Sequence, residues 1–339
     1  MFRRLIPDPF LVALVCVVAL AAVLPCSGRG AEIVDTLATL AIAMLFFLQG
    51  ARLAPETVVS GFTHWRLHLL VLACTFIMFP VLGLALHAAM PHLLSEPLWI
   101  GVLFLCALPS TVQSSIAFTS IGKGNIPGAI CSATASNLLG IFITPVLVGL
   151  LLSTQGGGGG GDISQIGKIV LQLLAPFILG QVLRPRIGAF VLRNKKILSM
   201  SDRGSILLVV YSAFSAAVVN GIWQRLSISE LLVVLVLDMV LLALVLTVTT
   251  VAARLLGFNK PDEVTIVFCG SKKTLASGVP MANVLFPGPE AGTIILPLMV
   301  FHQVQLMVCA ALAQRYARII GAGASKPPVS SSVDAQRPN

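Results

Sequence analysis

The sequence predicts an all-α polytopic membrane protein of about ten transmembrane helices in two inverted five-helix repeats, with the fourth and ninth helices discontinuous. Of its 339 residues, 57% are hydrophobic and only 10% are charged, against roughly 25% charged in an ordinary soluble domain. Ten apolar runs follow one another along the chain, and Lys and Arg gather at the ends of these runs. A composition this apolar, with 7 cysteines, excludes a disordered chain and a small disulfide-stapled scaffold.

The ten runs are long enough to cross a bilayer, which takes about 20 apolar residues in a helix. They cover residues 9–25, 33–50, 67–90, 97–121, 126–152, 163–183, 204–221, 230–256, 263–287 and 292–318. A cleaved signal peptide is the alternative for the first run, but Pro25 before Cys26 suits neither signal peptidase and favours a retained helix. The cysteines contain no Cys-x-x-Cys pair, so we expect neither disulfides nor a metal site.

The basic residues orient the predicted helices, because cytoplasmic loops of membrane proteins are enriched in Lys and Arg. With a cytoplasmic N-terminus and ten spans, 17 of the 22 Lys and Arg fall in cytoplasmic loops and 3 fall outside, while Lys272 and Lys273 lie within the ninth run. We therefore expect both termini in the cytoplasm and the protein in a bacterial inner membrane. The net charge of +9 follows from these loops and does not indicate nucleic-acid binding.

Six consecutive glycines, Gly156–Gly161, divide the chain in its middle. Residues 1–155 form the first predicted five-helix repeat, residues 156–162 a flexible linker, and residues 163–320 the second repeat. Because five is an odd number, the second repeat enters the membrane in the opposite orientation, which is the arrangement of an inverted repeat. Residues 321–339 are rich in Ser, Pro and Gly and are expected to form a disordered cytoplasmic tail.

Polar or helix-breaking residues interrupt the fourth and the ninth run at corresponding depths. The fourth run contains Pro109–Ser115, where the proline removes a helix hydrogen bond, and the ninth contains Cys269–Thr274 with Pro280 beyond it. Unwound backbone at this depth is tolerated where it lines a cavity or is buried in protein. Paired interruptions in matching spans of two inverted halves indicate a transporter binding site, and two unrelated packed kinks are the alternative.

Polar side chains also lie at mid-membrane depth in the neighbouring runs. An ionisable group there is costly unless it is paired or faces water. We expect Asp238, in the eighth run, to pair with Lys272 or Lys273, while the other lysine faces a cavity. His302 is either a ligand or a neutral imidazole that is hydrogen-bonded within the bundle.

The fifth run carries Ser132, Ser136 and Gly140 at four-residue intervals on one helix face. Such a stripe of small residues is typical of close helix packing. Asn137 lies beside the stripe, and its amide needs partners or water at this depth. It is either a binding residue or a contact between helices.

Six segments of the sequence form a recognisable set: Leu45–Gly50, Leu108–Ser115, Gly180–Pro185, Asp202–Ser205, Phe268–Gly278 and Phe301–Met307. Together they resemble the SBF-like branch of the bile acid:sodium symporter family, and the resemblance runs over residues 3–320. It implies ten helices divided into a panel domain of spans one, two, six and seven and a core domain of the other six. It also implies that spans four and nine cross at their breaks and that the core moves against the panel.

One position departs from the sodium-coupled members of that family, whose ninth-span crossover carries an acidic sodium ligand. Here that position is Ser271, followed by Lys272 and Lys273, and Ala129 and Ala133 stand where hydroxyl ligands would be expected in the fifth span. A lysine ammonium in such a site supplies the positive charge itself and repels an ion. We therefore expect ligand binding and transport not to depend on sodium.

The expected function is secondary transport of an organic anion or related metabolite by alternating access, because half-helix N-termini and the lysines favour a negatively charged group. The candidate substrate- and ion-binding residues are Pro109, Gln113, Ser114, Ser115, Asn137, Ser271, Lys272, Lys273, His302 and Gln303, with Ser132, Ser136 and Asp238 in support. The alternatives are a proton-coupled exchanger with Lys272, Lys273 or Asp238 as the carrier, and a membrane regulator that does not transport.

The sequence carries no hydrolase or phosphate-binding motif, so we do not expect an enzyme. We expect no cofactor, apart from Na⁺ or H⁺ as the candidate coupling ion. The expected partners are the lipid bilayer and a small organic solute, without nucleic acid, and no particular oligomeric state is predicted.

Overall fold

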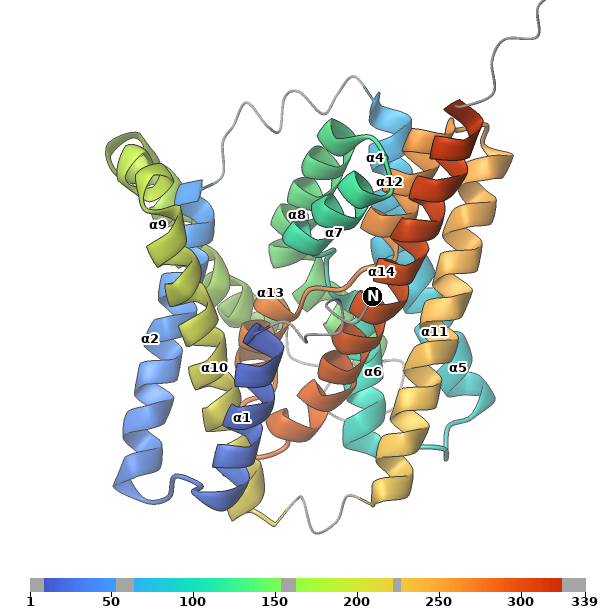
Figure 1. Cartoon of the computed structure of the whole chain (residues 1–339). Helices are drawn as coiled ribbons and strands as arrows, with labels where there is room; N and C mark the ends of the chain where they lie inside the picture. Colours follow the sequence, from blue (N-terminus) through green and yellow to red (C-terminus); the bar gives the residue numbers. More distant parts are fainter. Residues whose placement is uncertain (1–8, 53–63, 154–162, 222–226, 325–339) are drawn as a thin grey trace, which may run out of the picture.

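The computed structural model describes residues 9–52, 64–153, 163–221 and 227–324, which form helices joined by short turns, without a β-strand (Figure 1). The elements are α1 Pro9–Val23, α2 Arg29–Arg52, α4 Trp65–Ala73, the π-helix η3 Cys74–Met78, α5 Phe79–Ala89, α6 Glu96–Ala107, α7 Val112–Ile121, α8 Ile126–Ser153, α9 Ile163–Arg193, α10 Lys195–Val219, α11 Ile228–Leu255, α12 Lys260–Gly270, α13 Leu275–Leu285 and α14 Ala291–Ala324.

Within the described residues, six helical segments are long and apolar enough to cross a membrane, and the bent pair α6–α7 makes a seventh. The six are Arg29–Arg52, Trp65–Ala89, Ile126–Leu152, Ile197–Val219, Ile228–Leu255 and Ala291–Ile320. The pair α6–α7 is bent by 62° at its break. The chain is therefore an all-helical polytopic membrane protein, while its arrangement as ten spans in two inverted repeats stays a prediction.

The junction of α9 and α10 differs from the predicted loop. α9 continues to Arg193 and α10 starts at Lys195, so the segment 184–203 is helical apart from one residue. That residue, Asn194, separates the two helices, and its side-chain amide donates to the carbonyl of Phe190 over 2.9 Å. A helix that is already formed extends readily beyond its apolar run, since each added residue gains one backbone hydrogen bond.

The predicted linker and tail lie largely outside the described residues. α14 continues to Ala324, so the first residues of the segment 321–339 are helical rather than disordered. The linker 156–162 and the residues from 325 onward are not among those that the structure describes. The division of the chain into two repeats and a tail stays a prediction.

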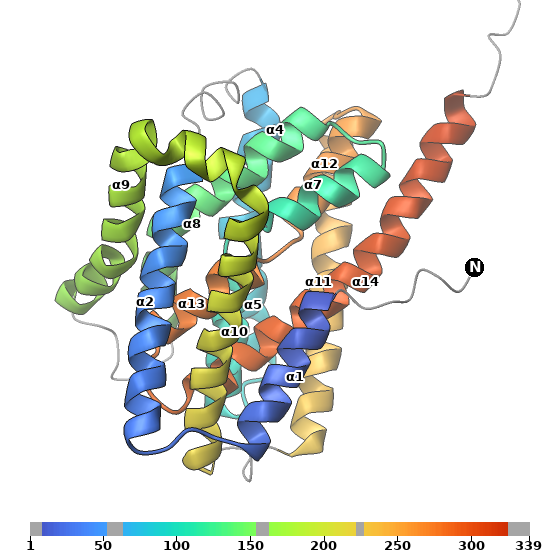
Figure 2. The same cartoon turned by 60° about the vertical axis from the view of Figure 1, so that its left-hand side comes forward.

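The helices α1, α2, α9 and α10 pack together as one group (Figures 1 and 2). α2 runs along both α9 and α10, and α1 packs on α10. Gly50 of α2 faces the backbone carbonyl of Phe177, and Gly180 of α9 faces that of Phe47, so a Cβ atom at either glycine would collide with the carbonyl opposite. Close backbone approach through small residues is a common way in which membrane helices associate.

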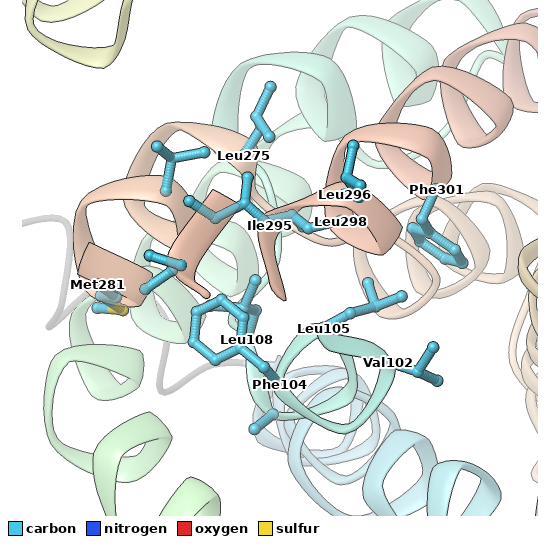
Figure 3. Close-up of a cluster of buried hydrophobic side chains, with 14 of the residues drawn as sticks. Val102, Phe104, Leu105, Leu108, Leu275, Met281, Ile295, Leu296, Leu298 and Phe301 are labelled. Carbon is cyan, nitrogen blue, oxygen red and sulfur yellow. The ribbon is translucent and has the colours of Figure 1, made fainter. Parts of the chain in front are cut away.

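The second group contains the other helices, including the interrupted pairs α6–α7 and α12–α13. A cluster of buried side chains, drawn in Figure 3, joins Phe104 and Leu105 of α6 to Leu275 of α13 and to Ile295 and Phe301 of α14. Lipid tails are as apolar as these side chains, so burial alone contributes little to this association. Dispersion contacts in a closely packed cluster hold the helices together and fix the positions of the breaks.

Candidate functional site

The two interrupted helix pairs are joined at their breaks by direct hydrogen bonds. The backbone N–H of Thr274 donates to the carbonyl of Pro109 over 3.1 Å, and the hydroxyl of Thr111 donates to the carbonyl of Lys273 over 2.8 Å. Unpaired backbone groups are costly in the bilayer core, and each break here supplies partners for the other. The two breaks therefore form one structural unit.

Hydroxyls near the first break also satisfy the C-terminal end of α12. Ser110 donates to the carbonyl of Cys269 over 2.6 Å, and Ser115 donates to the carbonyl of Phe268 over 3.1 Å. The last carbonyls of a helix have no partner within the helix and need one from elsewhere. The predicted binding residue Ser115 is fully buried in this contact.

The stripe of small residues on α8 supports the first break from the other side. The hydroxyl of Ser136 accepts the backbone N–H of Ser110 over 3.0 Å. Gly140 lies against the ring of Pro109 so closely that a Cβ atom there would collide with it. The expected packing role of this stripe agrees with these contacts, because small residues let α8 approach the unwound backbone.

A cavity of about 580 Å³ lies beside the joined breaks, bordered on its other side by α1, α2, α9 and α10. Its polar lining residues are Gln49, Arg52, Thr111, Gln113, Ser114, Thr134, Asn137, Ser199, Asp202, Arg203, Thr274, Ser277 and His302. Four of the predicted binding residues are brought together here, namely Gln113, Ser114, Asn137 and His302. The structure thus places the predicted polar side chains of three separate segments at one cavity.

The cavity lies at the N-terminal ends of two half-helices. α7 begins after Thr111 and α13 begins after Thr274, and neither threonine side chain caps its helix. First-turn residues of both helices line the cavity. The first amide groups of a helix have no partner within it, and the helix dipole adds roughly half a positive charge at this end. Two such ends at one cavity favour a negatively charged group.

His302 is held in one orientation at this cavity by Gln305. The amide of Gln305 donates to Nδ1 of His302 over 2.9 Å and to the carbonyl of Lys273 over 2.8 Å. Because Nδ1 accepts a hydrogen bond, the proton of the neutral ring is assigned to Nε2. Gln305 also accepts the backbone N–H of Lys273 over 2.9 Å, so one amide on α14 fixes the second break.

The wall opposite the breaks carries charged residues that are absent from the predicted site. Arg52, at the end of α2, forms an ion pair with Asp202 of α10, and Arg203 lies beside them in the cavity lining. Sequence reasoning counted both arginines as loop charges. The family resemblance is the feature of the sequence that could have indicated these residues, because they lie in or next to the segments Leu45–Gly50 and Asp202–Ser205.

The two buried lysines and Asp238 lie differently from the expectation. Lys272 and Lys273 are fully buried and neither lines the cavity. The ammonium of Lys273 donates to three backbone carbonyls, and that of Lys272 lies 3.8 Å from the centre of the Phe118 ring. Both carboxylate oxygens of Asp238 are buried without a hydrogen-bond partner among the described residues. The expected ion pair and the expected cavity-facing lysine are both absent, because free carbonyls and an aromatic face take up the two ammonium groups.

The remaining predicted residues do not line the cavity. Pro109, Ser115, Ser271 and Gln303 are not among its lining residues, and Ser132 contacts Nδ1 of His68 over 2.6 Å. Neighbouring positions on a helix point to different sides, so a correctly predicted segment contributes only some of its residues to one cavity. A part for these residues in binding stays a prediction.

A second cavity, of about 630 Å³, is lined by other stretches of the same helices. α2 contributes residues 45–52 to the first cavity and residues 35–42 to the second, and α10 contributes residues 199–206 and 212–220. In the second cavity the hydroxyl of Ser212 donates to the carboxylate of Asp35. α2, α10 and α13 therefore line a cavity toward each of their two ends.

Half-helix N-termini that meet a polar cavity inside an apolar bundle are the architecture of membrane transport proteins. Residues 8–318 match the model of the SBF-like CPA transporter family (DUF4137), and the chain belongs to this family. This confirms the resemblance found in the sequence.

Three relatives illustrate the range of the similarity. The chain is 59% identical to "Uncharacterized protein PA2026" of Pseudomonas aeruginosa, over 93% of this chain and 94% of that protein. It is 54% identical to "Putative symporter YfeH" of Escherichia coli K12, over 94% and 95%. It is 27% identical to "Sodium/bile acid cotransporter 7" of Xenopus tropicalis, over 91% of both chains.

Proposed function

We propose that this protein is a secondary transporter that carries an organic anion or a related metabolite through the 580 Å³ cavity. The observation that carries the proposal is the convergence of the uncapped N-terminal ends of α7 and α13 on that cavity. Amide donors from Gln113 and Asn137 and the imidazole of His302 supply further hydrogen-bonding groups beside these ends. A carboxylate or similar anion matches this set of donors.

We further propose that residues 1–155 and 163–320 are inverted repeats of five helices and that transport follows alternating access. The panel would be α1, α2, α9 and α10, and the core would be the remaining helices. Support comes from the two cavities, which occupy different stretches of α2, α10 and α13. A movement of the core against the panel would open one cavity as the other closes.

For the membrane orientation we propose a bacterial inner membrane with both termini in the cytoplasm. The 580 Å³ cavity reaches Arg52 and Arg203, which lie in two of the basic segments that we expect in the cytoplasm. By the excess of Lys and Arg in cytoplasmic loops, this end faces the cytoplasm. The conformation described would then be the inward-facing one.

We propose that binding at this cavity does not require sodium. Ser271 stands at the position where sodium-coupled members of the family carry an acidic ligand, and it is buried away from the cavity. Asp202 does line the cavity, but one of its carboxylate oxygens is already paired with Arg52. The second candidate is proton-coupled exchange, which is favoured by the buried carboxylate of Asp238, because it has no hydrogen-bond partner in the part of the chain that the structure describes.

The proposal is tested by a thermal-stability screen of the purified protein against anionic metabolites, in sodium buffer and in choline buffer. We expect at least one anion to raise the unfolding temperature equally in both buffers. Gln113→Ala should weaken the effect, because Gln113 lines the cavity, whereas Ser120→Ala should not, because Ser120 is exposed near the other end of the same helix and does not line the cavity. If no anion stabilises the protein, the result would favour the alternative function of a membrane regulator that does not transport.

A further inference from the structure

The buried side chain of Lys273 ends in a cluster of backbone oxygens. Its ammonium donates to the carbonyls of Thr75, Cys106 and Leu108 over 2.9, 2.9 and 2.7 Å. On another side it lies 3.9 Å from the centre of the Phe79 ring. These three hydrogen-bond partners are neutral oxygens, and among the described residues the ammonium forms no ion pair.

The carbonyl of Thr75 is available because the helix is locally wound as the π-helix η3. The N–H of Phe79, which would bond to Thr75 in an α-helix, donates instead to the carbonyl of Cys74. The next residue, Pro80, has no N–H to offer. Single π-helical turns of this kind occur frequently at functional sites. The sequence and winding of this segment thus leave one carbonyl for an outside donor.

The other two carbonyls belong to the interrupted end of α6. The N–H of Ser110 would complete the turn at Cys106, but it donates to the hydroxyl of Ser136 instead. Leu108 follows the last residue of α6 in an extended conformation, so its carbonyl lies outside the hydrogen-bonding pattern of the helix. A helix C-terminus carries a partial negative charge, which in the low dielectric of a bundle interior strongly favours a cation. The broken fourth helix therefore ends in a site suited to a positive charge.

Backbone carbonyls that converge on one point are also the ligands with which proteins replace the hydration shell of a monovalent metal ion. An ammonium group and a potassium ion are of similar size and both prefer such oxygens. The surroundings of the Lys273 ammonium thus have the composition of a cation site.

We infer that the carbonyls of Thr75, Cys106 and Leu108 form a monovalent-cation site that the ammonium of Lys273 occupies permanently, as a cation attached to the chain. Gln305 fixes the backbone of Lys273 by two hydrogen bonds, so the ammonium is held in place. The next residue, Thr274, opens α13 at the 580 Å³ cavity. The filled site thereby holds the N-terminus of α13 in its place without a dissociable ion.

The neighbouring lysine provides a matched control. Lys272 is equally buried, but its ammonium lies over the ring of Phe118 and has no hydrogen-bond partner among the described residues. Loss of Lys272 removes the same charge and volume without exposing a set of carbonyls. If the unfolding temperature depends on the cation in Lys273→Ala but not in Lys272→Ala, this dependence reports on the carbonyl site itself.

The test measures the unfolding temperature of the full-length protein in detergent, in potassium, sodium or N-methylglucamine chloride at constant ionic strength. The parent protein and Lys272→Ala should show no difference between the cations. Lys273→Ala should be the least stable in N-methylglucamine, and a tenfold rise in potassium or sodium should raise its unfolding temperature by about 2 °C.

Three results would overturn the inference: a Lys273→Ala protein with equal stability in all three cations, one that remains unfolded in all of them, or a parent protein that itself requires sodium or potassium. The experiment uses no organic ligand. The cation site and the proposed transport function can therefore fail independently of each other.

Discussion

The amide of Thr274 donates to the carbonyl of Pro109 over 3.1 Å, and this contact ties the interruption of one helix pair to the interruption of the other. The N-terminal ends of α7 and α13 are consequently held in a fixed relation at the 580 Å³ cavity. A binding site built this way depends on hydrogen bonds between unwound segments. Its integrity can therefore be tested with single substitutions.

Loss of one hydroxyl between the breaks should destabilise the protein. In Ser110→Ala the carbonyl of Cys269 loses its 2.6 Å partner and stays buried, which costs about 1–3 kcal/mol in the free energy of unfolding. Ser120→Ala, on the exposed face of α7, should change it by less than about 0.5 kcal/mol. Chemical denaturation in mixed micelles measures the free energy of unfolding of both variants. Equal stability of the two variants would contradict the hydrogen bond between Ser110 and the carbonyl of Cys269.

The crossing of α2 and α9 should not accept a methyl group. Gly50→Ala and Gly180→Ala each place a Cβ atom against a backbone carbonyl, so the helices must separate. We expect a loss of about 1–3 kcal/mol or more for each, as for other overpacked sites. Gly204→Ala on α10 has open space around it and is the control. Unfolding temperatures as high as that of the control would show that the two helices do not cross so closely.

Asp238→Asn should be tolerated. Breaking a buried ion pair typically costs about 3–5 kcal/mol, but Asp238 has no such pair among the described residues. Replacing a buried, unpartnered carboxylate by a neutral amide should leave the free energy of unfolding unchanged within about 1 kcal/mol, or raise it. Thermal unfolding at neutral pH measures this change. A severe loss would show that Asp238 is paired after all.

Thiol accessibility distinguishes cavity-lining from buried positions on α7. In a background without native cysteines, Gln113→Cys should react with a small hydrophilic thiol reagent, because Gln113 lines the cavity and is exposed there. Ser115→Cys, two residues further, should stay unreactive, since that side chain is fully buried. The rate of modification is read by mass spectrometry. If Gln113→Cys is unreactive under all conditions, this result would favour the alternative that the two breaks are packed kinks without a water-filled cavity.

The breaks can be predicted from the sequence because their residues are locally diagnostic. Pro109 cannot continue an α-helix, and the polar run Cys269–Thr274 stands out within an apolar span. Once the breaks were placed, Gln113 and Asn137 followed as residues at the same depth. This part of the prediction rests only on a proline that interrupts a helix and on polar residues within an apolar span.

The directions of the buried charges could not be predicted in the same way. The position of the Lys273 ammonium depends on a carbonyl freed by the π-helix at Cys74–Met78, and nothing in the hydropathy pattern marks such a turn. Arg52 and Asp202 were missed for a different reason. A charge count assigns residues at helix ends to a side of the membrane, but it does not tell which of them turn toward a cavity.

In the proposed function, an organic anion crosses the membrane through the 580 Å³ cavity without sodium. The most direct test is uptake into proteoliposomes of the anion that best stabilises the protein, in sodium and in choline buffer. We expect saturable uptake at equal rates in both buffers, reduced by Gln113→Ala and unchanged by Ser120→Ala. Uptake that needs sodium, or a stabilising anion that is never transported, would contradict the account.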